Sequence, residues 1–329
     1  MIADGTPIYS RGNHDFWEIV KVKKHFLLTV HEHPDGDCLG SMLALGMALK
    51  SLGGSILYCC NENLPAVYNF LPGIEQVQKK LPDEWQGEVL ISLDCSDICR
   101  LTIEHQKISD FFLINIDHHQ TNTNFGQLNL VDGNASATGE MIYNLLHPMV
   151  KIDYQMALCL MVAIITDTGF FRFANTTPGC LRIAAELMEA GVELGQLAEQ
   201  LQERKKITVL LLLGELLSSL KIGASGRIAW MSVTKEHLAK YGTEISETEG
   251  FVNYAKTIDG VLVGILFKEM DDQVIKVSLR SGPEIDASKI AQYFGGGGHP
   301  RAAGCSLKGN LSEAQSNFIT YLESQLMRK

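Results

Sequence analysis

Residues 26–37 read FLLTVHEHPDGD, an apolar run that ends in a cluster of histidine and carboxylate side chains. Three more short apolar runs follow at 55–58 (SILY), 89–93 (VLISL) and 112–116 (FLINI). Runs of this length, separated by helical patterns such as the one at 40–52, indicate buried strands of a parallel α/β sheet. Because open α/β sheets carry their chemistry at the carboxyl ends of the strands, we expect the functional site at these ends.

The first polar cluster consists of His31, Asp35 and Asp37. These side chains can converge if the chain turns sharply, and a proline and a glycine lie between them. Asp94 follows the third apolar run, where a carboxylate is costly to bury unless it is paired, hydrogen-bonded or bound to a metal. Two simpler interpretations stay open: a solvated acidic loop at the first cluster, and helix capping by Asp97 next to Asp94.

Asp117, His118 and His119 follow the fourth apolar run, and an aspartate with imidazoles at a strand end is typical of a metal site. Asp167 follows another apolar run, MVAIIT, so we expect it at a strand end as well, with a buried structural aspartate as the alternative. Carboxylate and imidazole ligands favour Mn²⁺, with Mg²⁺, Co²⁺ or Fe²⁺ as alternatives. Because so many converging carboxylates would repel one another, the pattern predicts two divalent metal ions.

The second half of the chain first becomes helical and then returns to an α/β pattern. Helices are predicted at 178–190, 194–204 and 207–220. Strands are then predicted at 227–233, 261–267 and 274–280, with helices at 287–294 and 312–327. We therefore predict a catalytic metal-binding domain at 1–196, a helical connecting arm at 197–222 and a smaller α/β substrate-binding domain at 223–329.

A glycine-rich segment, GGGGHPRAAG at 295–304, lies near the C-terminus. Consecutive glycines let backbone N–H groups approach a phosphate closely, and His299 and Arg301 add side-chain donors. Arg280, at the end of a predicted strand, can bind a terminal phosphate with two hydrogen bonds. A flexible loop is the alternative for the glycines, and an ion pair with a carboxylate such as Glu284 is the alternative for Arg280.

The composition restricts the class of function. The chain has 329 residues and a formal net charge of −10, and proteins that coat long nucleic acids normally present a basic face, so we expect any bound nucleic acid to be short. The eight cysteines include no Cys-x-x-Cys pair, which argues against a zinc ribbon and predicts free thiols in a reducing compartment. The N-terminus lacks a signal-peptide pattern and no apolar stretch has the length of a membrane span, so we expect a cytoplasmic protein.

The polar clusters together resemble the motif series of the DHH phosphoesterases. The matching motifs are His-x-x-Pro-Asp-x-Asp at 31–37, Asp-x-Ser-Asp at 94–97, Asp-His-His at 117–119 and Asp-Thr-Gly at 167–169. The glycine-rich segment, preceded by SLRS at 278–281, resembles the substrate-binding domain of one DHH branch. The chain is most similar to the stand-alone nanoRNase and pAp phosphatase group, which implies two α/β domains that face each other across a cleft with the active site.

The resemblance also implies roles for individual residues. One metal ion would be held by His31, Asp35, Asp94 and Asp167, and the other by Asp37, Asp94, His118 and Asp167. His119 would face the substrate phosphate, and Asp117 would orient His118. The implied substrate-binding residues are Arg280, Ser281, Gly296, Gly297, Gly298, His299 and Arg301.

The activity that the resemblance implies is hydrolysis of short oligoribonucleotides to mononucleotides, together with hydrolysis of pAp to AMP and phosphate. The expected partners are these substrates, with no long duplex nucleic acid and no membrane, and a homodimer is compatible with the sequence. A phosphodiesterase for cyclic di-AMP or pApA is the rival within the same chemistry. A nucleotide-sensing protein without turnover is the rival from a different class, and the complete set of ligand positions argues against it.

Overall fold

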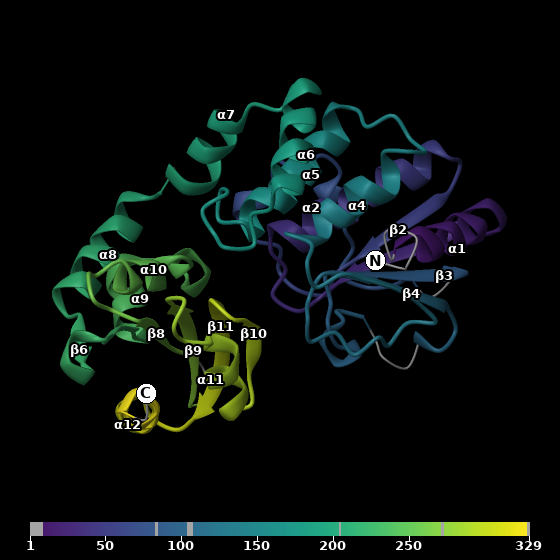
Figure 1. The fold of residues 1–329 in the computed structure, drawn as a ribbon. Helices are drawn as coiled ribbons and strands as arrows, with labels where there is room; N and C mark the ends of the chain where they lie inside the picture. Colours follow the sequence, from purple (N-terminus) through teal and green to yellow (C-terminus); the bar gives the residue numbers. More distant parts are fainter. Residues whose placement is uncertain (1–8, 83–84, 104–107, 204, 271–272, 328–329) are drawn as a thin grey trace. The chain divides into compact units, whose positions relative to one another are not determined.

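A computed structural model describes residues 9–82, 85–103, 108–203, 205–270 and 273–327 of the chain. The chain divides into two units, Met1–Glu203 and Arg204–Lys329, and each is described by itself below (Figure 1). Within the described residues, none of the helices combines the length and the apolarity that crossing a bilayer requires.

The N-terminal unit is built on a parallel sheet of five strands in the order β2-β1-β3-β4-β5. The strands are β1 (His25–Val30), β2 (Ser55–Cys59), β3 (Val89–Leu93), β4 (Phe112–Asp117) and β5 (Leu128–Val131). The pairing register places Leu27 of β1 opposite Leu57 of β2 and opposite Leu90 of β3. The parallel sheet and its first four strands are confirmed, whereas β5 was not predicted.

Both faces of this sheet are covered, which explains why β1 to β4 are mostly apolar. The helices of this unit are α1 (Tyr9–Val22), α2 (Gly36–Ser51), α4 (Thr138–Leu146), α5 (Tyr154–Asp167), α6 (Pro178–Glu189) and α7 (Leu194–Ala198), which a π-helical turn at Glu199–Glu203 follows. Figure 1 shows α2, α4, α5 and α6 gathered on one side of the strands. Leu28 belongs to the core on the helix side, whereas Leu27 packs with Phe111 in the core on the other face.

Helix α2 begins four residues earlier than predicted. Its N-cap is Asp35, whose carboxylate accepts hydrogen bonds from the backbone N–H groups of Asp37 and Cys38, each at 3.1 Å. Helix α2 therefore starts inside the first polar cluster, because the Asp35 carboxylate accepts hydrogen bonds from backbone N–H groups that have no partner within the helix.

Glycines let α2 approach α5 very closely. A Cβ atom added at Gly40 would lie 2.3 Å from the carbonyl oxygen of Cys159, and one at Gly36 would lie 2.5 Å from Cγ2 of Thr166. This contact brings the N-terminal turn of α2, with Asp37, beside the C-terminal turn of α5.

The prediction that Asp167 follows a strand is wrong. The apolar run before it forms the end of helix α5, and Asp167 is the last residue of that helix. Helix α5 is buried along most of its length, so its sequence is apolar on nearly every side and carries no helical periodicity.

The C-terminal unit contains a six-stranded mixed sheet in the order β10-β11-β9-β8-β7-β6, in which only β7 and β8 are parallel. Its strands are β6 (Lys221–Gly223), β7 (Ile228–Val233), β8 (Val263–Glu269), β9 (Val274–Ser281), β10 (Gly297–His299) and β11 (Ala302–Lys308). Its helices are α8 (Ile207–Ser218), α9 (Lys235–Tyr241), α10 (Phe251–Lys256), α11 (Ala287–Tyr293) and α12 (Leu311–Met327).

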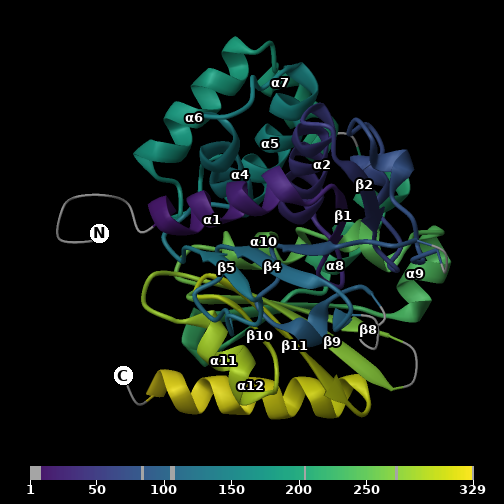
Figure 2. The ribbon, with the colours of Figure 1, turned by 90° about the vertical axis from the view of Figure 1, so that its right-hand side faces the viewer.

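Each face of this second sheet has a separate core. Leu266 of β8 packs with residues of α8 and α10 such as Leu212 and Phe251. Its neighbour Phe267 points to the other face and contacts Phe318 of α12, with ring centroids 5.8 Å apart. Figure 2 shows α11 and α12 together on that face of the strands. The second α/β domain predicted from the sequence is therefore present.

Candidate metal centre

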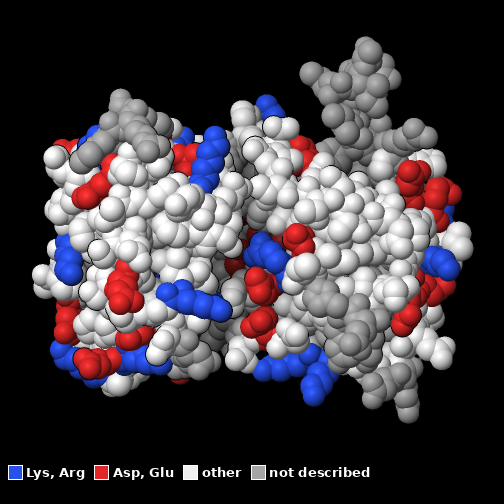
Figure 3. Space-filling model, turned by 90° about the horizontal axis from the view of Figure 1, so that it is seen from below, with Lys and Arg blue, Asp and Glu red and all other residues white. Residues whose placement is uncertain are grey.

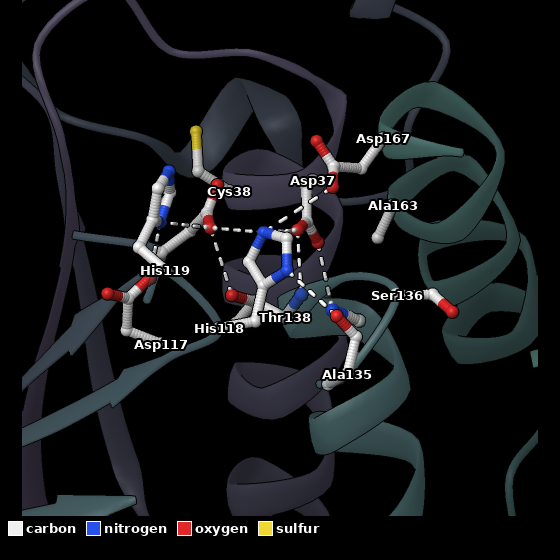
Figure 4. Close-up of polar contacts among 12 residues, drawn as sticks. Asp37, Cys38, Asp117, His118, His119, Ala135, Ser136, Thr138, Ala163 and Asp167 are labelled. Atoms are coloured by element: carbon white, nitrogen blue, oxygen red, sulfur yellow. Dashed lines mark hydrogen bonds and ion pairs between the residues drawn. The ribbon is translucent and has the colours of Figure 1, made fainter. Parts of the chain in front are cut away.

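The six predicted metal ligands come from five different elements of the N-terminal unit, and the structure brings them together. His31 follows β1, Asp35 and Asp37 lie at the start of α2, Asp94 follows β3, His118 follows β4, and Asp167 ends α5. One ligand atom each of Asp37, His118 and Asp167 lies within 4.8 Å of the others. Figure 4 shows these three side chains turned toward one another.

His118 is oriented so that its Nε2 atom faces the carboxylates. Its Nδ1 atom lies 3.1 Å from the carbonyl oxygen of Ala135, and because a carbonyl oxygen can only accept, Nδ1 carries the proton of this bond. Its Nε2 atom lies 3.6, 3.5 and 3.4 Å from carboxylate oxygens of Asp37, Asp94 and Asp167. A histidine whose other nitrogen donates to a backbone carbonyl is the usual arrangement of a metal ligand.

His31 is held in the same way on the other side of Asp94. Its Nδ1 atom lies 2.6 Å from the carbonyl oxygen of Glu32. Its Nε2 atom lies 3.5 Å from Oδ2 of Asp94 and 4.0 Å from Oδ1 of Asp35. The two oxygens of Asp94 therefore face two different histidines, since Oδ1 faces His118. This geometry suits a carboxylate that could bridge two cations.

Asp94 has an unusual backbone. Its φ angle is 56°, in the left-handed region that residues with a side chain rarely adopt. The carboxylate is buried and accepts a hydrogen bond from Oγ1 of Thr138 at 3.0 Å. A strained backbone that turns a buried carboxylate toward a cluster of polar groups is typical of a functional position. The nearby Asp97 caps a 3-10 turn by accepting from the N–H of Cys99 at 2.8 Å, so its predicted capping role is confirmed.

Asp37 is held by the N-terminus of α4. Its two oxygens accept hydrogen bonds from the backbone N–H groups of Thr138 at 2.7 Å and Gly139 at 2.8 Å, and Ser41 donates at 3.1 Å. Thr138 therefore supports both Asp37 and Asp94. Ser136 does not cap α4, because its hydroxyl donates to the carbonyl oxygen of Asn175 at 2.7 Å.

The prediction that Asp117 orients His118 is wrong, because Asp117 instead contacts His119. Oδ1 of Asp117 lies 2.7 Å from Nδ1 of His119, and Oδ2 accepts from Asn122 at 2.5 Å. In an extended chain, residues two apart project to the same side, which explains the pairing of 117 with 119. His119 also lies 3.6 Å from Asp94, at the edge of the cluster.

Burial and the neighbouring charges shift the pKa values of the cluster. Burial disfavours the imidazolium, but the carboxylates around it outweigh burial and raise the pKa of His31 to about 9 and that of His118 to about 10. Burial raises the pKa of Asp167 to about 6, with Asp94 and Asp35 adding to the effect, and burial also raises the pKa of Asp37. The cluster thus needs positive charge, which protonated histidines supply in the absence of a cation.

The donor set fits divalent metal ions that prefer oxygen and nitrogen ligands. Asp37, Asp94 and His118 are at most 4% exposed, so their charges are costly without compensation. Cys38 lies beside His31 and Asp35, but burial and the nearby carboxylates raise the pKa of its thiol well above the usual value. A thiol that stays protonated is a poor ligand, so this group favours an oxygen and nitrogen site over a zinc–thiolate site.

The predicted substrate-binding residues lie in the C-terminal unit, and some of them bond to its backbone. The hydroxyl of Ser281 donates to the carbonyl oxygens of Ile285 at 2.7 Å and Pro300 at 3.0 Å. The guanidinium of Arg301 donates to the carbonyl oxygens of Gly282 and, at 3.3 Å, of Ile285. Arg280, at the end of β9, donates to the carbonyl oxygen of its neighbour Leu279 at 2.9 Å.

The glycine run forms the turn after α11 and the edge strand β10, which pairs with β11 and carries His299. A Cβ atom at Gly296 would lie 2.1 Å from the carbonyl oxygen of Gly304, and Gly298 has a φ angle of 130°. These two positions need glycine for packing and backbone conformation. Gly297 has open space around its Cα, so hairpin packing does not account for a glycine there, and the phosphate-binding role of the run stays a prediction.

Comparisons with known proteins match both units. Residues 25–164 match the DHH family, N-terminal domain, and residues 232–327 match the DHHA1 domain. The chain is 34% identical over 314 residues to the bifunctional oligoribonuclease and PAP phosphatase NrnA of Thermus thermophilus, which covers 94% of this chain and 93% of that protein. It is 32% identical over 288 residues to the protein of the same name from Bacillus subtilis, and this match covers 85% of this chain and 88% of that protein.

A solved structure has the same fold as this chain. The crystal structure of an exopolyphosphatase-related protein from Bacteroides fragilis matches with a TM-score of 0.88 at 25% sequence identity, and the match covers 97% of this chain and 98% of that chain.

Proposed function

This chain belongs to the DHH family of phosphate-ester hydrolases, and we propose that it cleaves short oligoribonucleotides to mononucleotides and pAp to AMP and phosphate. The observation that carries the proposal is the convergence of Asp37, Asp94, His118 and Asp167 at one buried centre. The names of the similar proteins from Thermus thermophilus and Bacillus subtilis support the substrate class.

We propose that two divalent ions, Mn²⁺ in the first place, occupy this centre. His31, Asp35, Asp94 and Asp167 would hold one ion, and Asp37, Asp94, His118 and Asp167 would hold the other. When bound, the ions would stabilise charge on the phosphate and lower the pKa of the attacking water. Mg²⁺, Co²⁺ and Fe²⁺ have compatible ligand preferences.

The residues of the chain itself then position the reacting groups. The backbone N–H groups at the N-terminus of α4 fix the Asp37 carboxylate, and the Ser41 hydroxyl adds a third hydrogen bond. Asp117 lies 2.7 Å from Nδ1 of His119 and orients this ring, and we propose that the ring faces the substrate phosphate. Arg280, His299 and the glycine run of the C-terminal unit are proposed to bind a second phosphate of the substrate.

The charge of the protein supports a preference for short substrates. Lys and Arg side chains stand among Asp and Glu side chains on the face in Figure 3 rather than in one continuous stripe, and the net charge is −10. Each phosphate beyond the proposed clamp therefore meets repulsion instead of a basic track. We expect turnover per end to fall steeply from RNA of two to five nucleotides to a 24-mer.

A substrate panel tests the proposal. The protein is assayed with Mn²⁺ on a dinucleotide, pAp, pApA, cyclic di-AMP and a 24-mer RNA, with EDTA and the variant Asp94→Asn as controls. Preferred turnover of the dinucleotide and pAp supports the proposal. Exclusive turnover of pApA and cyclic di-AMP would favour the cyclic-dinucleotide phosphodiesterase. Equal degradation of the 24-mer would contradict the short-substrate model, and no turnover at all would favour a nucleotide sensor.

We also place the protein in the cytoplasm. All eight cysteines are free thiols, and seven of them are buried, which fits a reducing compartment. Whether the chain forms a homodimer is a separate proposal, which light scattering tests directly.

A further inference from the structure

The loop between α5 and α6, residues 168–177, connects the metal centre to a group of aromatic side chains. It begins directly after the proposed ligand Asp167 and contains Phe170, Phe171, Arg172 and Phe173. Neither the proposed metal ligands nor the proposed phosphate clamp uses any of these four residues.

The loop is attached to the proposed ligand at both ends. Asn175 donates from its amide to the backbone oxygen of Asp167 at 3.1 Å, to Oδ2 of Asp167 at 3.3 Å and to the backbone oxygen of Ser136 at 2.9 Å. Ser136 donates in return to the backbone oxygen of Asn175 at 2.7 Å. Both ends of the loop are therefore fixed relative to Asp167, and the residues between them stay near this proposed ligand.

The backbone of this loop is held in a conformation that needs support. Gly169, Phe170 and Phe171 have φ angles of 56°, 58° and 61°, three consecutive residues in the left-handed region. Phenylalanine rarely adopts this conformation, and it persists where packing overdetermines it. Phe170 and Phe171 are partly buried against the core of the N-terminal unit, which supplies that packing.

Phe173 differs from the other two phenylalanines because 40% of its surface is exposed. Its ring lies against Gly169, where an added Cβ atom would be 2.4 Å from Cζ of the ring. Two Cα–Cα steps of about 3.8 Å separate Gly169 from Asp167, so the Cα atom of Gly169, against which the ring packs, lies within about 7.6 Å of the Cα atom of the ligand. Arg172 is exposed beside it and donates from Nε to the backbone oxygen of Gly169 at 2.7 Å.

We propose that Phe173 is the stacking platform for the base of the nucleotide whose phosphate lies at the metal centre. The inference rests on the proposed function, and it names the residue that makes the site prefer nucleotides to other phosphate esters. Stacking on a phenylalanine suits every base, because each base has a π face, and it would bind RNA without a sequence preference. Arg172 would lie beside the stacked base with its cationic group.

Binding of AMP and of ribose 5-phosphate, which lacks the base, tests the inference without turnover. Isothermal titration of the Mn²⁺-loaded protein measures both Kd values for the wild type and for Phe173→Ala, Phe173→Trp and Tyr154→Ala. Tyr154 is an exposed aromatic residue at the opposite end of α5 and is the matched control. We expect Phe173→Ala to weaken AMP binding roughly 5- to 150-fold while ribose 5-phosphate binding is unchanged. Phe173→Trp and Tyr154→Ala should both keep the wild-type preference for AMP.

Two results would overturn the inference. One is a preference for AMP that survives in Phe173→Ala. The other is an equal loss of affinity for both ligands, which would assign Phe173 a structural role at the phosphate site. Dinucleotide turnover is measured in parallel and separates the two proposals: a wild type that binds AMP through Phe173 but cleaves no dinucleotide contradicts the proposed function and leaves the platform supported.

Discussion

The close contact between α2 and α5 makes Gly40→Ala a sharp test of how the metal centre is positioned. An added Cβ atom would lie 2.3 Å from the carbonyl oxygen of Cys159, and such contacts are essentially never shorter than 3.0 Å. The helices must therefore separate by about 0.7 Å at this point. Because the contacted atom belongs to the backbone, no side-chain rotation can relieve the clash.

The separation affects both stability and activity. Overpacking costs about 1–3 kcal/mol, and the higher helix propensity of alanine offsets about 1 kcal/mol of that, so we expect a net loss of up to about 2 kcal/mol. In a unit of this size the melting temperature should fall by up to about 8 °C. Asp37 on α2 also moves relative to Asp167 on α5. Since a misplacement of about 1 Å can cost roughly 100-fold, kcat/KM should fall by about 10- to 100-fold.

The assay compares thermal unfolding and Mn²⁺-dependent hydrolysis of a dinucleotide in Gly40→Ala and in Gly214→Ala. Gly214 lies within helix α8, and an added Cβ atom there meets no atom within 4 Å. The control variant should therefore gain about 1 kcal/mol of stability and keep full activity. If Gly40→Ala melts at or above the wild-type temperature with unchanged kcat/KM, the helix contact does not position the metal ligands.

Three further predictions concern single residues. Asp94→Asn should abolish turnover and lower the metal content seen by elemental analysis, whereas Asp97→Ala should stay active and lose about 1 kcal/mol as a capping variant; an indispensable Asp97 would reverse these assignments. Without a cation the pKa values of His31 and His118 are about 9 and 10, so both rings are protonated at pH 7. Each ring must lose its proton before Nε2 can bind a metal, so the affinity for Mn²⁺ should rise from pH 6 toward pH 9. Calorimetry in two buffers measures this affinity and the protons released on binding, and an affinity that does not change with pH would contradict the prediction. Arg301→Ala should lose about 2 kcal/mol in denaturant unfolding because its guanidinium donates to two backbone carbonyls; an unchanged stability with a raised KM would instead show that it binds substrate.

The parallel sheet was predictable because its strands are buried on both faces, so the runs at 26–30 and 89–93 are apolar except for Thr29 and Ser92. Strand β5 was missed because LNLV is short and alternates apolar with polar residues at the edge of the sheet. The apolar run in helix α5 predicts a strand for the opposite reason: a helix buried on nearly every side shows no period of 3.6 residues.

The convergence of the acidic and histidine clusters followed from a general rule about strand ends, and it holds for His31, Asp94 and His118. The supporting contacts did not follow from any rule. The bonds from Thr138 and Gly139 to Asp37 join residues about 100 positions apart, and the sequence has no local signal for them. Only the packing of α4 against α2 reveals that Thr138 belongs to the site.

A ribosome delivers the proposed metal ligands in chain order, from His31 first to Asp167 last. The strands β1, β3 and β4 can pair as they emerge, but α5 docks on α2 only after the whole segment has been synthesised. A nascent chain that ends before α5 holds an incomplete set of ligands and competes poorly for divalent ions. From the proposed ligand set we therefore expect metal loading to be a late event in the biogenesis of this unit, so that a metal-loaded protein is one whose N-terminal unit has finished folding.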